Sequence, residues 1–158
     1  HKYLLKLKTA EAIRMLHENM PCSEISRQLG FSNQNYFSTV FKRETGINFK
    51  DYVINVRMDK AKELLRDDLK KVELYLNRQS FAARLTQGMF DALVSFIFNV
   101  GSGAFQTSTM RKCLCTGDFE AAAAQFGRWI FGTVNGKKEK LPGLATRREK
   151  EREIFLNG

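Results

Sequence analysis

The segment LTQGMFDALVSFIFNVGSGAF, residues 85–105, decides what kind of fold this chain adopts. Thr86 stands where its hydroxyl can cap a helix, and the residues after it are apolar on nearly every side. A helix without a polar face is buried in a protein core. The sequence therefore predicts a core helix here, with other elements packed around it.

Helices are also expected on the C-terminal side of this segment. One begins at Thr107–Thr109 and runs through MRKCLCTG, and Asp118 can cap another over FEAAAAQFGRWIFG. Trp129, in that second helix, is interpreted as a core side chain. The segment NGKKEKLPG predicts a basic loop, and a last helix is expected from Leu144 to about Leu156.

The N-terminal side of the core segment contains an unusually long helical pattern. Residues 49–77, FKDYVINVRMDKAKELLRDDLKKVELYLN, hold no Gly or Pro, and their apolar residues recur at helical spacing. Asn48 can cap this stretch. The pattern predicts either one long helix or two helices that meet near Asp67 and Asp68.

Two shorter helices are expected before the long one. Ser23 can cap SEISRQLG, which Gly30 ends, and Ser32 can cap NQNYFSTVFKRETG, which Gly46 ends. The second helix has an apolar face at i, i+3 and i+4, made of Tyr36, Phe37, Val40 and Phe41. Two helices joined through a tight turn with a glycine are typical of a helix-turn-helix.

Composition excludes disordered and fibrous classes but leaves the partner open. The 158 residues carry a net charge of +9, with 12 basic against 8 acidic residues in 1–67 and 14 against 9 in 68–158. Nucleic acid, a membrane surface and an anionic cell wall all suit such a charge. No membrane span or secretory leader is expected, and three cysteines indicate reduced thiols in a cytoplasmic protein without metal or cofactor.

The segment ISRQLGFSNQNYFSTVFKRETG, followed by FKDYVINVRMDKAKELL, resembles the DNA-binding domain of AraC-type transcription regulators. The resemblance covers about residues 8–66 and implies a helix-turn-helix whose second helix enters the major groove. Short amide and hydroxyl side chains there suit base edges, and basic ones suit phosphates. The candidate DNA-binding residues are Ser32, Asn33, Gln34, Asn35, Tyr36, Ser38, Thr39, Lys42 and Arg43.

The remainder of the chain resembles a different family. LLRDDLKKVE, LTQGMFDALVSFIFNVGSGAFQTSTMRKCL, GDFEAAAAQFGRWIF and LPGLATRREKERE look like the C-terminal lobe of lambdoid phage lysozymes, over about residues 64–158. The two resemblances overlap at 61–68. They predict an all-α protein: a helix-turn-helix module over 1–66, joined through a shared helix to a lysozyme-like lobe over 67–158.

The lysozyme resemblance also bears on catalysis. In that family the catalytic carboxyl groups belong to the N-terminal lobe, in a pattern that begins with Glu-Gly. This chain has no Glu-Gly dipeptide, and Glu73, Asp91 and Glu120 are interpreted as surface or capping residues. The sequence therefore predicts that the catalytic residues are absent and that the protein is not an enzyme.

A candidate wall-substrate surface follows from the same resemblance. Its residues are Gln87, Asn99, Thr109, Arg111 and Arg147. The alternative interpretation is structural, with Asn99 and Thr109 as helix caps and the arginines paired with Glu149 and Glu153.

These patterns predict three functions. The main prediction is a chimeric, engineered protein that binds double-stranded DNA weakly and in a salt-dependent way. The first alternative is a peptidoglycan-hydrolysing or wall-binding protein. The second is a product of recombination that was selected for folding and has no biological activity. Truncated domains leave apolar faces to cover, so a homodimer is a further expectation.

Overall fold

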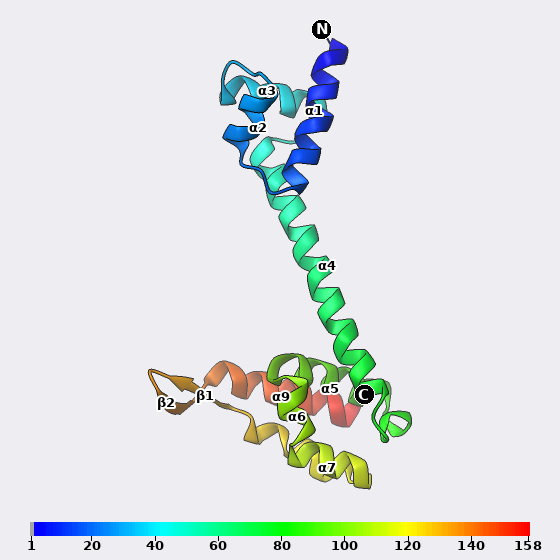
Figure 1. Cartoon of the computed structure of the whole chain (residues 1–158). Helices are drawn as coiled ribbons and strands as arrows, with labels where there is room; N and C mark the ends of the chain where they lie inside the picture. Colours follow the sequence, from blue (N-terminus) through cyan, green and yellow to red (C-terminus); the bar gives the residue numbers. More distant parts are fainter. Residues whose placement is uncertain (1) are drawn as a thin grey trace. The chain divides into compact units, whose positions relative to one another are not determined.

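The computed structural model describes residues 2–158, which form two compact units, His1–Leu64 and Leu65–Gly158 (Figure 1). We call them unit 1 and unit 2. The long helix α4 (Phe49–Asn77) is continuous, so the prediction of a single helix is confirmed and that of a break near Asp67 is wrong. Asn48 accepts a hydrogen bond from the Asp51 amide (2.9 Å) and caps α4 as expected.

Unit 1 contains α1 (Lys2–His17), α2 (Cys22–Gln28), α3 (Gln34–Thr45) and the first part of α4. Its core is aromatic: the ring centroid of Phe49 lies 5.1 Å from those of both Phe37 and Phe41. The predicted apolar face of α3 is confirmed for Phe37, Val40 and Phe41, which are buried. Tyr36 is 45% exposed, so its assignment to that face is wrong.

The expected caps of α2 and α3 need correction. The N-cap of α2 is Pro21, without a side-chain hydrogen bond, so Ser23 lies inside the first turn. Asn33, not Ser32, caps α3, and its side-chain oxygen accepts a hydrogen bond from the Tyr36 amide (2.8 Å). Asparagine and serine cap equally well, so propensity could not choose between the two adjacent residues. Gly46 ends α3 in the left-handed conformation, as predicted.

Unit 2 is built around α5 (Gln87–Val100), the core helix predicted from residues 85–105, and Thr86 caps it as expected. Around α5 lie the end of α4 and the helices η1 (Ala82–Arg84), α6 (Ser102–Gln106), α7 (Thr109–Thr116), α8 (Phe119–Ala124), η2 (Phe126–Arg128) and α9 (Pro142–Asn157). Phe96 lies at the centre, fully buried, with edge-on contacts to Phe105, Phe126 and Trp129. Within residues 2–158, no helix is both long and apolar enough to cross a membrane.

The all-α prediction is wrong in one place. Strand β1 (Phe131–Val134) pairs antiparallel with β2 (Lys137–Lys140), where a helix end and a basic loop were expected. Asn135 (φ 50°) and Gly136 (φ 77°) form the connection, and an Asn-Gly pair with two positive φ values is the preferred two-residue hairpin turn. That dipeptide was the available signal for this hairpin.

The turn gives a first testable prediction. Gly136→Ala should destabilise the hairpin by about 1–2 kcal/mol, because an alanine side chain disfavours positive φ. Amide hydrogen exchange of β1 and β2 should therefore accelerate, while the amides of α5 keep their protection. Gly103→Ala is the control, since its added Cβ would meet open space without a positive φ. Unchanged exchange in Gly136→Ala would contradict this account of the hairpin.

Candidate functional site

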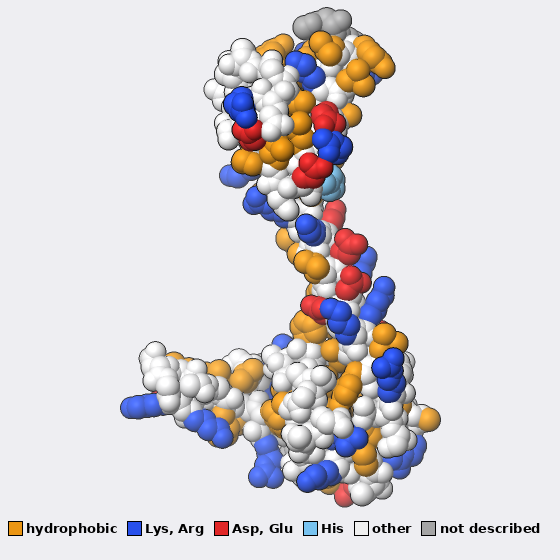
Figure 2. All heavy atoms as spheres, in the orientation of Figure 1, with side chains coloured by type: hydrophobic (Ala, Val, Ile, Leu, Met, Phe, Trp, Pro, Cys, Tyr) orange, Lys and Arg blue, Asp and Glu red, His pale blue; other side chains and the backbone are white. Residues whose placement is uncertain are grey.

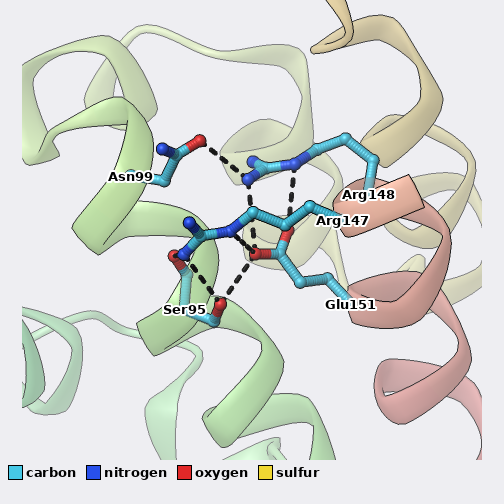
Figure 3. Close-up of polar contacts among 5 residues, drawn as sticks. All are labelled: Ser95, Asn99, Arg147, Arg148 and Glu151. Atoms are coloured by element: carbon cyan, nitrogen blue, oxygen red, sulfur yellow. Dashed lines mark hydrogen bonds and ion pairs between the residues drawn. The ribbon is translucent and has the colours of Figure 1, made fainter. Parts of the chain in front are cut away.

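The polar centre of unit 2 lies where α5 meets α9 (Figure 3). Ser95 and Asn99 are one turn apart on α5, and Arg147, Arg148 and Glu151 share one turn of α9. Residues three or four apart lie on the same helix face. The two helices thus bring these five polar side chains together beside an otherwise apolar core.

Glu151 is the shared acceptor of this network. One of its oxygens, Oε1, accepts hydrogen bonds from Ser95 Oγ (2.7 Å) and Arg147 Nε (3.0 Å). The other, Oε2, forms an ion pair with Arg148 Nε at 3.1 Å. Asn99 Oδ1 accepts a hydrogen bond from Arg148 Nη2 (2.8 Å), and Arg147 Nη2 donates to the carbonyl oxygen of Ser95 (3.1 Å).

Two of the three charged residues in this network are buried. Arg148 is 1% exposed and Glu151 is 3% exposed, whereas the side chain of Arg147 is 40% exposed. Burial lowers the pKa of the Arg148 guanidinium, and the neighbouring Glu151 carboxylate opposes that change. Because one carboxylate faces two guanidinium groups, the cluster carries one excess positive charge.

Arg148 is also held by a ring. Its guanidinium carbon lies 4.7 Å from the ring centroid of Phe96, within the range of a cation–π interaction. Its Nη1 atom is buried and has no hydrogen-bond partner among residues 2–158. The position of this cation is therefore fixed by α5, α9 and the aromatic core.

A groove of about 560 Å³ runs beside the network, between α5 and α9. Arg147, the most exposed of the three ionised residues, lines it with Lys150, and Asp91 and Glu151 supply the opposite charge. Its apolar lining includes Ala92, which is buried, and Ile154, which is exposed. Such a groove can hold a ligand that combines apolar surface with hydrogen-bonding groups.

Two of the five predicted wall-substrate residues belong to this network, Asn99 and Arg147. The other three lie elsewhere in unit 2. Gln87 donates to Asp91 (2.7 Å) in the first turn of α5, Arg111 Nε donates to Gln79 (3.0 Å), and Thr109 is the exposed first residue of α7. The structure therefore does not gather all five into one place.

The alternative interpretation, in which these residues cap helices or form ion pairs, is also wrong in its details. Ser108, not Thr109, caps α7, and Asn99 binds Arg148 instead of capping a helix. Arg147 and its neighbour Arg148 pair with Glu151, not with Glu149 or Glu153, and Arg111 bonds to Gln79. Sequence reasoning overlooked Ser95 and Glu151; the available signal was an Arg-Arg-x-x-Glu spacing, which puts an acid on the same helix face as two bases.

The nine candidate DNA-binding residues lie at the start of α3 and along it, in unit 1. Several of their polar atoms bind their own helix: Ser38 Oγ donates to the Gln34 carbonyl (2.9 Å) and Thr39 Oγ1 to the Asn35 carbonyl (3.0 Å). Arg43 pairs with Glu44 at 3.1 Å, and Lys42 is exposed. Gln34 and Ser38 also line a groove of unit 1.

Comparison with known proteins assigns the chain to a family. The model of the family described as phage lysozyme matches residues 27–151, well over half of the chain. The chain belongs to the phage lysozyme family. The match begins inside unit 1, so it takes in α3 and all of α4 as well as most of unit 2.

The similarity of the chain to individual endolysins supports this family assignment. The chain is 42% identical over 100 residues to an endolysin of Acyrthosiphon pisum secondary endosymbiont phage 1, covering 63% of this chain and 68% of that protein. It is 39% identical over 122 residues to the SAR-endolysin of Enterobacteria phage P21, covering 76% and 69%. It spans only 36% of the endolysin of Bacillus phage B103.

Solved structures show the same lysozyme fold. The muramidase domain of SpmX from Asticaccaulis excentricus is similar with a TM-score of 0.55 and 35% identity, covering 63% of this chain and 67% of that one. An endolysin from Escherichia coli O157:H7 phage FAHEc1 gives a TM-score of 0.53 and 34% identity, covering 63% and 62%. The chain is thus mostly helical with a lysozyme-like muramidase fold.

These findings overturn the main functional prediction. A weakly DNA-binding chimera is wrong as the primary function, because the relatives and solved structures are endolysins and a muramidase domain. None of these comparisons shows an AraC-type helix-turn-helix. The first alternative, activity on peptidoglycan, fits a chain of this family better.

Proposed function

We propose that this lysozyme acts on peptidoglycan, with unit 2 holding the substrate as a muramidase-type lobe. The observation that carries the proposal is the similarity of this fold, at 35% identity, to a muramidase domain. Membership of the phage lysozyme family and the basic charge of the chain, which suits an anionic wall, support it.

Within unit 2 we propose the α5–α9 groove as the substrate-facing site. Ser95 and Glu151 orient the Arg147 guanidinium, and 40% of that side chain remains accessible. A donor fixed by neighbouring hydrogen bonds binds a ligand at little entropic cost. The Arg147 guanidinium is therefore suited to hydrogen-bond sugar or amide oxygens.

Glu151 is a positioning residue in this proposal. Glycoside hydrolysis uses one carboxyl group as an acid and a second carboxylate across the scissile bond. Glu151 is 3% exposed and its oxygens contact Ser95, Arg147 and Arg148, so it has no free access to a substrate bond. The loss of the family's catalytic residues, inferred from the missing Glu-Gly pair, stays a prediction. It makes binding and cleavage separate questions for experiment.

Two measurements on one preparation test the proposal. Purified peptidoglycan sacculi should co-sediment with the chain, and release of new reducing ends from the sacculi would show hydrolysis. Arg147→Ala should reduce co-sedimentation about tenfold, because it removes a charged donor from the groove. Arg78→Ala, at an exposed arginine outside the pockets of unit 2, is the matched control. Absence of both sedimentation and reducing ends would refute the proposal.

A further inference from the structure

A second pocket of unit 2 lies between η2, the end of β2 and α9, and we call it the η2–α9 pocket. Its volume is about 390 Å³, within the range of small-ligand sites. Gly127 and Ile130 line one side, Lys140 comes from β2, and Arg148, Glu149 and Arg152 come from α9. It is distinct from the α5–α9 groove, and Arg148 belongs to the polar network and also lines this pocket.

The charges around the η2–α9 pocket are mostly positive. Lys140 and Arg152 are exposed at it, against the single carboxylate of Glu149. The buried Arg148 adds to this sign, because it shares the Glu151 carboxylate with Arg147 and keeps Nη1 without a partner among residues 2–158. Figure 2 shows further basic side chains over the neighbouring hairpin. Concave surfaces lined by one sign of charge concentrate ions of the other sign.

The charges that line the α5–α9 groove are balanced instead. Its two basic residues, Arg147 and Lys150, are balanced by Asp91 and Glu151. A neutral sugar or amide suits the groove, whereas an anionic group suits the η2–α9 pocket. Both pockets lie on α9, which contributes residues to each.

We propose that the η2–α9 pocket binds a carboxylate of the peptide that branches from the glycan of peptidoglycan. This inference rests on the proposed function and names a part of its substrate. Lys140 and Arg152 donate to the carboxylate from the rim, and the fixed charge of Arg148 favours the anion from below. The apolar lining of Ile130 and Ala145 contacts the aliphatic part of the peptide.

Two matched ligands test this assignment by isothermal titration with the full chain. One is a soluble disaccharide-tetrapeptide from peptidoglycan, and the other is the same molecule with its peptide carboxylates converted to carboxamides. The carboxamide ligand should bind about tenfold more weakly, the loss expected for a charged hydrogen bond. The Lys140→Gln, Arg152→Gln double variant should bind both ligands with the same, weakened affinity.

A variant that fills the η2–α9 pocket without changing its charge tests the proposal independently. An added Cβ at Gly127 would meet nothing within 4 Å, so the leucine side chain of Gly127→Leu has room at the pocket. Because that side chain would occupy the pocket, the variant should bind the carboxylate ligand more weakly. Gly103→Leu and Lys137→Gln are the controls for size and charge, because both residues lie outside the pocket.

The outcomes separate this inference from the proposed function. Equal affinity for the two ligands, or wild-type affinity in the double variant and in Gly127→Leu, would overturn the carboxylate site and leave the proposed function standing. Failure of sacculi and of both soluble ligands to bind would refute the two together. A tenfold ligand difference that disappears in the double variant supports the assignment.

Discussion

Replacing Glu151 with glutamine is expected to cost unit 2 about 3–5 kcal/mol of stability. The substitution keeps the shape of the side chain but removes the one carboxylate that Arg147 and Arg148 share. Arg148 is 1% exposed, so its charge would remain buried without a counter-ion. Broken pairs of this kind are costly because the surviving ion has lost its hydration.

Thermal unfolding followed by circular dichroism measures the effect. For a unit of this size, the midpoint should fall by at least about 12 °C. Glu153→Gln is the matched control: it removes the same charge from an exposed position on α9 and should change stability by no more than about 0.5 kcal/mol. Equal midpoints for the Glu151 and Glu153 variants would show that the buried ion pair does not stabilise α9 on α5.

Phe96→Ala is the second substitution with a large expected effect. Phe96 is fully buried, contacts three other aromatic rings and lies under the Arg148 guanidinium. Truncation leaves a cavity at the centre of unit 2 and removes the cation–π partner of Arg148. The expected loss is about 3–5 kcal/mol, as for other buried phenylalanines.

A neighbouring residue provides the control for Phe96. Phe98 is on the same helix and is 40% exposed, so Phe98→Ala leaves no comparable cavity. Urea unfolding of both variants should show a large fall in the midpoint for Phe96→Ala and a much smaller one for Phe98→Ala. The reverse order would mean that the core of unit 2 is centred elsewhere.

The buried arginine connects stability with the proposed function. A buried ion pair is a weak stabiliser compared with an apolar core, yet here it fixes Arg147 beside one pocket and puts a positive charge beside another. In the proposed function, the network orients groups for the ligand at some cost in stability. Other residues of α9 that contribute to the α5–α9 groove can change without this cost, since most of them are exposed.

Sequence periodicity predicted most helices correctly because it reflects local physics. The apolar run of 85–105 gave the core helix α5. The absence of Gly and Pro over 49–77 gave the helical span of α4 but left open whether it was one helix or two, and the structure shows one. Resemblance of residues 64–158 to phage lysozymes gave the family of the chain, although the family match extends further, over residues 27–151. The resemblance of residues 8–66 to DNA-binding proteins led to the wrong main function, because a local helix-turn-helix pattern specifies a surface shape and not a ligand.

The candidate site was harder to predict from sequence. Asn99 and Arg147 were named, but Thr109, Gln87 and Arg111 lie away from them, and Glu151 was not recognised as the arginine partner. Glu151 is the one acid that lies three or four residues from both Arg147 and Arg148, so the spacing along α9 could have identified this pairing. The packing of α5 on α9 adds what the spacing could not show, which is that Arg148 and Glu151 are buried.

The sequence by itself determined most of the helices, the end of α3 at Gly46 and the lysozyme resemblance, since these depend on residues near one another in the chain. Tertiary structure decided which of the charged residues on α9 are buried, that Ser95 and Asn99 of α5 join them, and that the η2–α9 pocket is predominantly positive. These features depend on contacts such as Ser95 with Glu151 and Asn99 with Arg148, across about 50 residues of chain. No local pattern encodes such contacts, because burial and charge compensation are properties of the packed elements together.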